Sequence, residues 1–509
     1  MADATRPQVS CLQALTGAIA LARALRAHWR RDELHVGILL PPSVGGALVN
    51  LAAALSGRTS VNLNYTTGQA GMESAAKQAG LRSLVTSRLF VEKASLILPT
   101  GIEPIWLDEL GVTISTASKL YAFVLAVLAP IRLLQRGCGA ARTPSIDDIV
   151  TIIFSSGSTG EPKGVLLSHF NIDSNVEAVA QVFGIQPDDR LLGILPFFHS
   201  FGYMATLWLA VNHGMGVVYH PSPLDAVPIG TLTKRYRVTF LVATPTFLQL
   251  YLRRCTPEQF GSLRAVLTGA EKLPERLALA FEDKFGIRPL EGYGVTEAAP
   301  VIAVNVPGFR APGFNQSGAR RGHVGHPLPG VVVRVVDPDT WEPRPIGTAG
   351  MLLVKGPNVM RGYLGRDDLT ANATRDGWYI TGDIGIIDED GFIQITDRLS
   401  RFSKIGGEMV PHGRVEQALQ EAAGADLQVF AVTGVPDERK GERLAVLHTL
   451  DEASLPAIVE KIATGGLPNL FVPRRDQFIK VDKLPVLGTG KLDLREVKRV
   501  AIERLAAST

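Results

Sequence analysis

Short apolar segments that end at turn residues alternate with helical segments between residues 12 and 269, and this alternation limits the fold more than any other feature. The helical pattern is clearest at 12–29 and 43–57. The apolar segments that predict strands are 35–43, 82–87, 148–156, 190–196, 239–245 and 263–269. Strands that alternate with helices form layered, mostly parallel sheets, so the pattern predicts an α/β fold.

The pattern changes from about residue 323, where strands separated by Gly and Asp-Gly turns predict an antiparallel β region. After Arg398 it becomes mixed α+β, with a helix expected near 413–423. A chain of 509 residues exceeds what one hydrophobic core supports. We therefore predict a large N-terminal domain of layered α/β subdomains plus a β-rich region at 1–397, and a small C-terminal α+β domain at 398–509.

Charge and cysteine content exclude some classes of protein. The net charge of +3 is too small to indicate a nucleic-acid partner. Three widely spaced cysteines provide no disulfide framework and no paired metal ligands, which favours a reducing cytoplasm. Residues 1–10 lack the charged and apolar regions of a secretory signal.

The most apolar window is "LYAFVLAVLAP", residues 120–130. It is shorter than a membrane-spanning helix requires, and Pro130 interrupts it. Two interpretations remain. The segment is a buried helix, or it is a surface helix that enters a bilayer with help from Arg132 and Arg136. The second interpretation predicts peripheral contact with the inner face of the cell membrane through residues 120–136.

The stretch "SSGSTGEPKG", residues 155–164, follows a predicted strand and is suited to phosphate binding. It lacks the spacing of a Walker A loop. It combines hydroxyl donors, glycines that let backbone N–H groups approach phosphate oxygens, and a lysine; these residues are Ser155, Ser156, Gly157, Ser158, Thr159, Gly160 and Lys163. Alone, such a loop is either a flexible connection or a ligand site.

Four further motifs follow in order: "EGYGVTEAAP" (291–300), "GWYITGDIG" (377–385), "DRLSRFSKIGGEMV" (397–410) and "LPVLGTGKLDLREV" (484–497). Together with the loop, they resemble the core motifs of the adenylate-forming superfamily, which contains acyl-CoA synthetases, luciferases and peptide-synthetase adenylation domains. Segments 36–66, 195–202 and 397–416 are more specifically similar to the bacterial fatty acyl–acyl carrier protein synthetases. In several bacteria that module is fused to a lysophospholipid acyltransferase, and this chain resembles the synthetase half.

This resemblance implies two half-reactions with ATP and Mg²⁺ as cofactors. A medium- or long-chain fatty acid first forms acyl-AMP and pyrophosphate, and a thiol then takes the acyl group and releases AMP. The thiol belongs to holo acyl carrier protein or, in the alternative, to coenzyme A. A third interpretation, from a different class, is a non-catalytic nucleotide or lipid sensor that retains the fold.

The resemblance also assigns roles around the nucleotide. Tyr293 and Gly294 contact adenine, Thr296 contacts the α-phosphate, and Glu297 holds Mg²⁺ against the phosphates, as suits a hard cation. A Thr-Glu pair is otherwise typical of a helix N-cap. The segment "TGAEKL" provides Gly269, Ala270 and Glu271 around the base.

In the later motifs, Asp383 corresponds to the residue that binds the ribose hydroxyls, and Arg398 assists at the ribose or phosphate. Lys491 corresponds to the lysine that stabilises negative charge during adenylation. The loop 155–163 then clamps the β- and γ-phosphates, with Thr159 as a second contact to Mg²⁺.

Three predictions remain open between alternatives. His199, in "PFFHSFG", is either a core histidine or a gate between the nucleotide and acyl pockets. Ser400 stands where the family has an Asp or Lys as the pivot of a rotating small domain. A set of basic residues in the C-terminal region either meets an acidic carrier protein, binds the CoA nucleotide, or is an ordinary solvated face: Arg401, Lys404, Arg414, Arg474 and Arg475.

Overall fold

The computed structural model describes residues 1–155, 162–398, 401–405, 408–425, 428–437, 441–464, 467–486 and 492–506. These form two compact units, of which the first comprises Met1–Val333 and Val354–Tyr379. The second comprises Arg334–Leu353 and Ile380–Thr509. This division differs from the boundary expected at residue 397, which stays a prediction.

One seven-stranded sheet of the first unit has the order β18-β6-β5-β2-β1-β3-β4. Its strands are β1 (His35–Leu39), β2 (Thr59–Asn62), β3 (Ser83–Thr86), β4 (Glu103–Trp106), β5 (Ile149–Ser155), β6 (Lys163–Ser168) and β18 (Gly362–Tyr363). Strands β5, β2, β1, β3 and β4 run parallel, and β6 and β18 are antiparallel additions at one edge. The predicted α/β class is confirmed.

A second seven-stranded sheet has the order β15-β12-β11-β10-β9-β7-β8. Its strands are β7 (Arg190–Gly193), β8 (Gly216–Tyr219), β9 (Phe240–Ala243), β10 (Ala265–Thr268), β11 (Pro289–Gly294), β12 (Val301–Val304) and β15 (His326–Pro327). The strands from β8 to β11 are parallel, whereas β12 and β15 are antiparallel.

Helices cover these sheets and begin at recognisable caps. Helix α8 (His169–Phe183) begins at a Ser168–Asn171 capping box and ends at Gly184, whose φ is 52°. The other helices of more than three residues in the first unit are α1 (Cys11–Leu25), α2 (Val44–Leu55), α3 (Gly68–Gln78), α4 (Arg88–Lys93), α5 (Leu107–Thr113), α6 (Thr116–Leu128), α7 (Ile131–Cys138), α11 (Ala226–Tyr236), α12 (Pro245–Arg254), α13 (Pro257–Phe260), α14 (Glu275–Phe285) and α15 (Asp367–Asn372).

Helix α9 (Ser200–Gly202), a π-helical segment (Tyr203–Leu209) and helix α10 (Ala210–Asn212) follow one another directly. The π-helical segment is almost entirely buried. Segments of this kind are frequent at functional sites.

The remaining strands include the β-rich region that the sequence predicts. They are β13 (Phe309–Ala311), β14 (Phe314–Gln316), β16 (Val332–Val336), β17 (Gly350–Lys355), β19 (Thr374–Arg375), β20 (Trp378–Ile387) and β21 (Ile393–Arg398). Strands β13 and β14 form an antiparallel pair, and so do β20 and β21.

The rest of the second unit contains a sheet of order β23-β22-β25-β24, in which β26 also pairs with β25. Its strands are β22 (Phe402–Ile405), β23 (Glu408–Pro411), β24 (Phe430–Asp437), β25 (Gly441–His448) and β26 (Phe478–Lys480). Its helices are α16 (His412–Ala423), α17 (Leu455–Thr464) and α18 (Leu494–Ala506). Helix α16 confirms the helix expected near 413–423.

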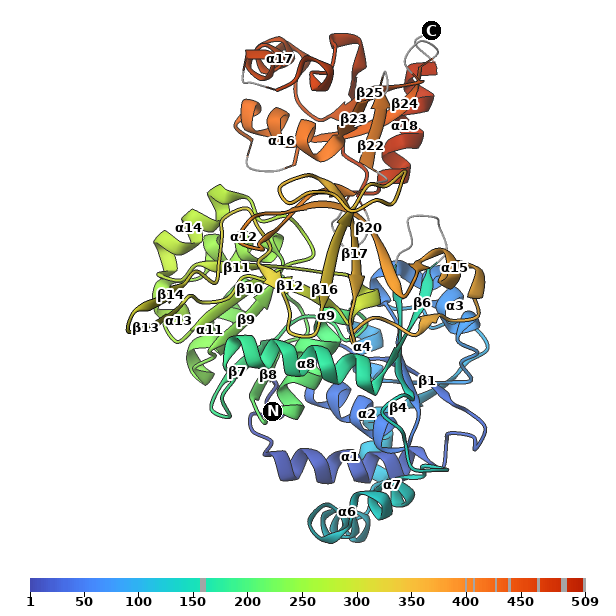
Figure 1. Cartoon of the computed structure of the whole chain (residues 1–509). Helices are drawn as coiled ribbons and strands as arrows, with labels where there is room; N and C mark the ends of the chain where they lie inside the picture. The colour runs from blue at the N-terminus through green and yellow to red at the C-terminus, as the bar shows by residue number, and fades with distance from the viewer. Residues whose placement is uncertain are drawn as a thin grey trace. The chain divides into compact units, whose positions relative to one another are not determined.

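Helices α6 and α7 lie beside α1 on the outside of the first unit (Figure 1). In α6 only Ala122 is buried, so the interpretation of 120–130 as a buried helix is wrong. In the part of the chain that the structure describes, no single helix has both the length and the apolar character needed to cross a membrane. Helices α5 and α6 meet that requirement only as a pair, with a bend of 91° between them.

Candidate functional site

The carboxyl ends of three neighbouring parallel strands bring two of the predicted nucleotide-binding segments together. Strand β10 lies between β9 and β11 and is parallel to both, so all three end at the same edge of the sheet. Residues 269–271 follow β10 directly, and Tyr293 and Gly294 end β11. Ligands of open α/β sheets bind beyond the carboxyl ends of the strands, which makes this edge the candidate nucleotide site.

The backbone at these two strand ends is closely packed. A Cβ atom on Gly294 would lie 2.1 Å from the carbonyl oxygen of Pro300, so only glycine fits there. Ala270 has a φ of 69°, which is unusual for a residue with a side chain. The next residue is held by a side-chain hydrogen bond, because Thr246 Oγ1 donates to Glu271 Oε2 at 2.7 Å. The segment after β10 is therefore fixed by its own contacts.

Glu297 is held by tyrosine. It lies in the 3₁₀ turn Thr296–Ala298, and its half-buried carboxylate accepts a hydrogen bond of 2.8 Å from the Tyr363 hydroxyl. Burial and the neighbouring carboxylate raise the pKa of Tyr363 above its usual value, which keeps the hydroxyl protonated and able to donate. Burial likewise raises the pKa of Tyr379, and the neighbouring Glu297 and Tyr363 add to this shift. The carboxylate is thus held in position by the Tyr363 hydroxyl.

The ends of the Ser/Gly-rich loop are placed by the sheet. Ser155 ends β5, Lys163 begins β6, and the two residues are paired across the strands. The Lys163 ammonium lies 5.4 Å from the centre of the Tyr363 ring, so the loop returns next to the residue that holds Glu297. Residues Ser156, Gly157, Ser158, Thr159 and Gly160 lie outside the described residues. Their roles stay predictions.

His199 is exposed, so its interpretation as a core histidine is wrong. Its ring lies 5.3 Å from that of Phe198. The following residue links this segment to the site, because Ser200 Oγ donates to Thr296 Oγ1 at 3.4 Å. His199 is therefore one residue from a direct contact with the Thr-Glu pair, and its role as a gate stays a prediction.

Asp383 and Arg398 face each other across β20 and β21 in the second unit. Arg398 Nε lies 3.0 Å from Asp383 Oδ1, and the Asp383 side chain is only 3% exposed. A carboxylate this deeply buried requires such a partner. The structure therefore brings these two predicted residues together, while Lys491 lies outside the described residues.

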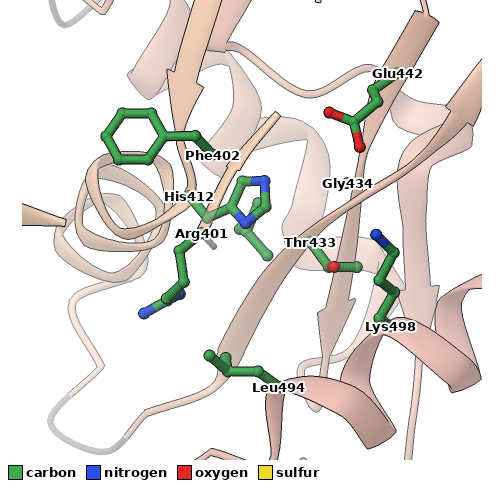
Figure 2. A pocket seen from close by; sticks show the side chains of 9 residues that line it. Arg401, Phe402, His412, Thr433, Gly434, Glu442, Leu494 and Lys498 are labelled. Atoms are coloured by element: carbon green, nitrogen blue, oxygen red, sulfur yellow. The ribbon is translucent and has the colours of Figure 1, made fainter. Parts of the chain in front are cut away.

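Arg401 is not a surface residue, which corrects one interpretation of the basic set. Its guanidinium lies 2.5 Å from Glu416 Oε1 and is 18% exposed, so it forms a largely buried ion pair instead of meeting an acidic partner. It lines a cavity of about 60 Å³ together with His412, Lys498 and Glu442 (Figure 2). Burial lowers the pKa of His412 to about 3, and its Nε2 lies 2.8 Å from Ser403 Oγ. Arg414, Arg474 and Arg475 are exposed.

Two residues of the site were missed in the sequence. Tyr363 follows Gly362 in "RGYLG", and Ser200 follows His199 in a motif that was considered only for its histidine. Neither position has a local pattern that distinguishes it from a turn or a helix start. Only the fold, which places them beside Glu297 and Thr296, reveals them.

Glu297 suits magnesium better than it suits a metal held by protein alone. Within the described ranges, no group of three or more His, Cys, Asp and Glu side chains could hold a metal ion. Magnesium in nucleotide enzymes is usually held by one or two carboxylates and by the phosphates of the substrate, so a single fixed carboxylate fits that role.

A fixed carboxylate beyond the carboxyl ends of a parallel sheet, with a lysine near the tyrosine that holds it, is typical of an α/β protein that binds a nucleotide and its metal ion. Comparison with known proteins names the class. The family of AMP-binding enzymes matches residues 5–364. A feruloyl-CoA synthase of Amycolatopsis sp is 32% identical over 407 residues, covering 77% of this chain and 80% of the relative. The chain therefore belongs to the AMP-binding enzyme family.

Relatives and solved structures that extend over nearly the whole chain support this assignment. A long-chain-fatty-acid–CoA ligase of Bacillus subtilis (strain 168) is 27% identical over 510 residues, covering 94% of this chain and 87% of the relative. The structure of ATP-bound MatB from Rhodopseudomonas palustris has a TM-score of 0.81 at 26% identity, covering 99% of this chain and 95% of MatB. The MenE structure from Bacillus subtilis with ATP and magnesium has a TM-score of 0.77 at 26% identity, covering 95% of this chain and 93% of MenE.

Proposed function

We propose that this protein is an ATP- and Mg²⁺-dependent ligase that joins a fatty acid to the thiol of coenzyme A. The observation that carries the proposal is the Glu297 carboxylate, held by Tyr363 beside Lys163 at the nucleotide edge of the sheet. The similar MatB and MenE structures bind ATP, and one MenE structure binds magnesium as well, which supports the same cofactors here.

The reaction has two balanced steps. A carboxylate oxygen of the acid attacks the α-phosphorus of ATP, and pyrophosphate leaves. The thiol sulfur then attacks the acyl carbon, the thiol loses its proton, and AMP leaves. In the first step Glu297 holds Mg²⁺ on the phosphates, Thr296 contacts the α-phosphate, and Lys491 stabilises the developing charge. These groups lower the barrier by orientation and charge neutralisation.

The remaining predicted residues bind the nucleotide. Tyr293 stacks on the adenine, and Gly269, Ala270 and Glu271 surround it. Asp383 binds the ribose hydroxyls, with Arg398 in support. The loop from Ser155 to Lys163 clamps the β- and γ-phosphates. Each of these roles is a proposal that rests on the motif and on the position of the residue.

A medium- or long-chain fatty acid is the proposed substrate. The Bacillus subtilis fatty acid ligase aligns over almost the full chain. Segments 240–252 and 264–270, proposed to border the acyl channel, are mostly apolar and contain no aspartate or lysine that could meet an amino acid. An apolar channel favours a long chain, because each buried CH₂ contributes about 0.8 kcal/mol.

Coenzyme A is the proposed acceptor, because the relatives described above are CoA ligases by name. Holo acyl carrier protein is the second candidate. It is favoured by the similarity of residues 36–66, 195–202 and 397–416 to acyl carrier protein synthetases and by the exposed Arg414, Arg474 and Arg475, which would meet an acidic protein. Both acceptors and ATP are cytoplasmic, so we propose that the enzyme works in the cytoplasm.

Pyrophosphate exchange tests the first step. The protein should return labelled pyrophosphate into ATP when palmitate is present and should leave AMP, not ADP. The absence of exchange with every medium- and long-chain acid would favour a non-catalytic sensor. A side-by-side assay with palmitate, ATP and either coenzyme A or holo acyl carrier protein then decides the acceptor. Faster thioester formation on the carrier protein would overturn the choice of coenzyme A.

A further inference from the structure

Helices α6 and α7 present a continuous apolar surface to solvent. Six of its side chains are between 43% and 74% exposed; we define these as the α6–α7 surface: Leu120, Phe123, Val124, Val127, Leu128 and Ile131. Isolated exposed apolar residues are ordinary, but a contiguous set of large ones marks an interaction site. The unit that carries them has extensive hydrophobic cores elsewhere, formed by other residues.

The orientation of α6 is fixed by contacts on its other side. Ala122 is fully buried, and α6 packs against α1. The guanidinium of Arg23 on α1 lies 4.3 Å from the centre of the Tyr121 ring. With 100° per residue, the exposed side chains from Phe123 to Leu128 cover an arc of roughly 140° opposite Ala122. The outward apolar face is therefore built into the packing of α6.

The charged residues in the stretch of chain that carries this surface are all basic. Residues 110–146 contain no Asp or Glu, but they contain Lys119, Arg132, Arg136 and Arg142. Arg132 and Arg136 are exposed and stand four residues apart on α7, so they lie on the same side of that helix. Arg142 is paired with Asp148, whereas Arg132 and Arg136 have no acidic neighbour in this stretch of sequence. An apolar face with basic residues at its border complements an anionic bilayer.

We propose that the α6–α7 surface docks the protein on the surface of a membrane that contains anionic lipids. The apolar side chains enter the boundary between headgroups and acyl chains, while Arg132 and Arg136 meet lipid phosphates. The helix lies on the bilayer and does not cross it, because α6 has only 13 residues. A second copy of the chain fits less well, since a twofold contact through this surface would bring the same arginines together.

Docking on a membrane would also bring the enzyme close to its substrate, an inference that rests on the proposed function. Fatty acids partition into bilayers, so docking would hold the enzyme where its proposed substrate is concentrated. The docking itself is independent of catalysis and can be measured without substrate.

Sedimentation with lipid vesicles tests the proposal. The full chain is mixed with vesicles of phosphatidylcholine alone or of phosphatidylcholine with one quarter phosphatidylglycerol, at low and at high salt. We expect binding to the anionic vesicles, weakened by salt, and little binding to the neutral ones. The variant Val127→Asp/Leu128→Asp should reduce the partition coefficient at least about tenfold. The variant Arg132→Gln/Arg136→Gln should reduce it about fivefold for each arginine and should remove most of the salt dependence.

The chain provides a matched control. Leu224 and Val227 are 62% and 60% exposed, close to Leu128 and Val127 at 74% and 53%, and they lie outside the α6–α7 surface. The variant Leu224→Asp/Val227→Asp should bind vesicles like the wild type, and circular dichroism should show all variants folded. Equal losses in both aspartate pairs, or binding that ignores lipid charge, would overturn the proposal. So would a wild-type dimer in sedimentation velocity that only Val127→Asp/Leu128→Asp dissociates, because a second copy would then cover the surface.

Discussion

Replacing Tyr363 by Phe removes one hydroxyl group from the candidate site and leaves the rest of the side chain in place. The ring is 6% exposed, and its packing and its contact with Lys163 should persist. What is lost is the hydrogen bond of 2.8 Å to Glu297 Oε1. Tyr363 is therefore proposed as a positioning residue that acts through Glu297.

The size of the expected effect follows from that one bond. A hydrogen bond to a charged group contributes roughly 1.5–3 kcal/mol. Because about 1.36 kcal/mol on the activation barrier is a factor of ten, palmitate-dependent pyrophosphate exchange should fall about 10- to 150-fold. The bond orients the carboxylate proposed to hold Mg²⁺, so the KM for Mg·ATP should rise, and excess Mg²⁺ should restore part of the rate.

Tyr379→Phe is the matched control. It removes a hydroxyl from the tyrosine that neighbours Tyr363 but leaves the bond from Tyr363 to Glu297, so the rate of exchange should fall no more than about fivefold. Circular dichroism and urea unfolding establish that both variants are folded. The reasoning is refuted if folded Tyr363→Phe keeps wild-type exchange and wild-type Mg²⁺ dependence while Glu297→Gln is inactive.

Four further outcomes are expected. Gly294→Ala should lose exchange activity and about 1–3 kcal/mol of stability in urea unfolding, because its new Cβ would meet the Pro300 carbonyl. Burial raises the pKa of Glu291 from 4.5 to about 7, so the folded state loses stability as pH rises through that window, and Glu291→Gln should flatten this part of the urea-midpoint profile. For His412 the sign is opposite. Its pKa falls from 6.5 to about 3, so stability is lost as pH falls below 6.5, and His412→Gln should reduce that acid dependence. Lys491→Ala should abolish pyrophosphate exchange but still form thioester from supplied acyl-AMP; equal loss of both steps would contradict its proposed role.

Much of the fold could be predicted from the sequence because the first unit is built from local patterns. The apolar segments at 35–43 and 239–245 became β1 and β9, since short β-branched and aromatic runs bounded by turn residues have few other stable arrangements. The order of strands in the two sheets could not be predicted in the same way. It depends on which strands pair over long distances in the chain, as in β5 beside β2.

The candidate site was only partly predictable, and the reason is the distance between its parts along the chain. Thr296 and Glu297 are recognisable by their motif, but Tyr363, which holds Glu297, stands 66 residues later in the short strand β18. A sequence pattern also does not show how deeply a side chain is buried. Arg401 carries a charge, as surface residues usually do, but it is largely buried. His199 lies among aromatic residues in the sequence, but it is exposed.

The Arg401–Glu416 pair has a consequence for how this sequence can change during evolution. Removing one partner of a buried ion pair costs about 3–5 kcal/mol, because the other charge is left without compensation. Replacing both partners by apolar residues of similar volume is often neutral or stabilising. A chain with only one of the two substitutions is therefore less stable than the chain with both charges or the chain with neither. In descendants of this chain, positions 401 and 416 should keep their charges together or lose them together, and a loss should also involve Asp397, a buried carboxylate whose Oδ1 lies 3.9 Å from Arg401 Nε.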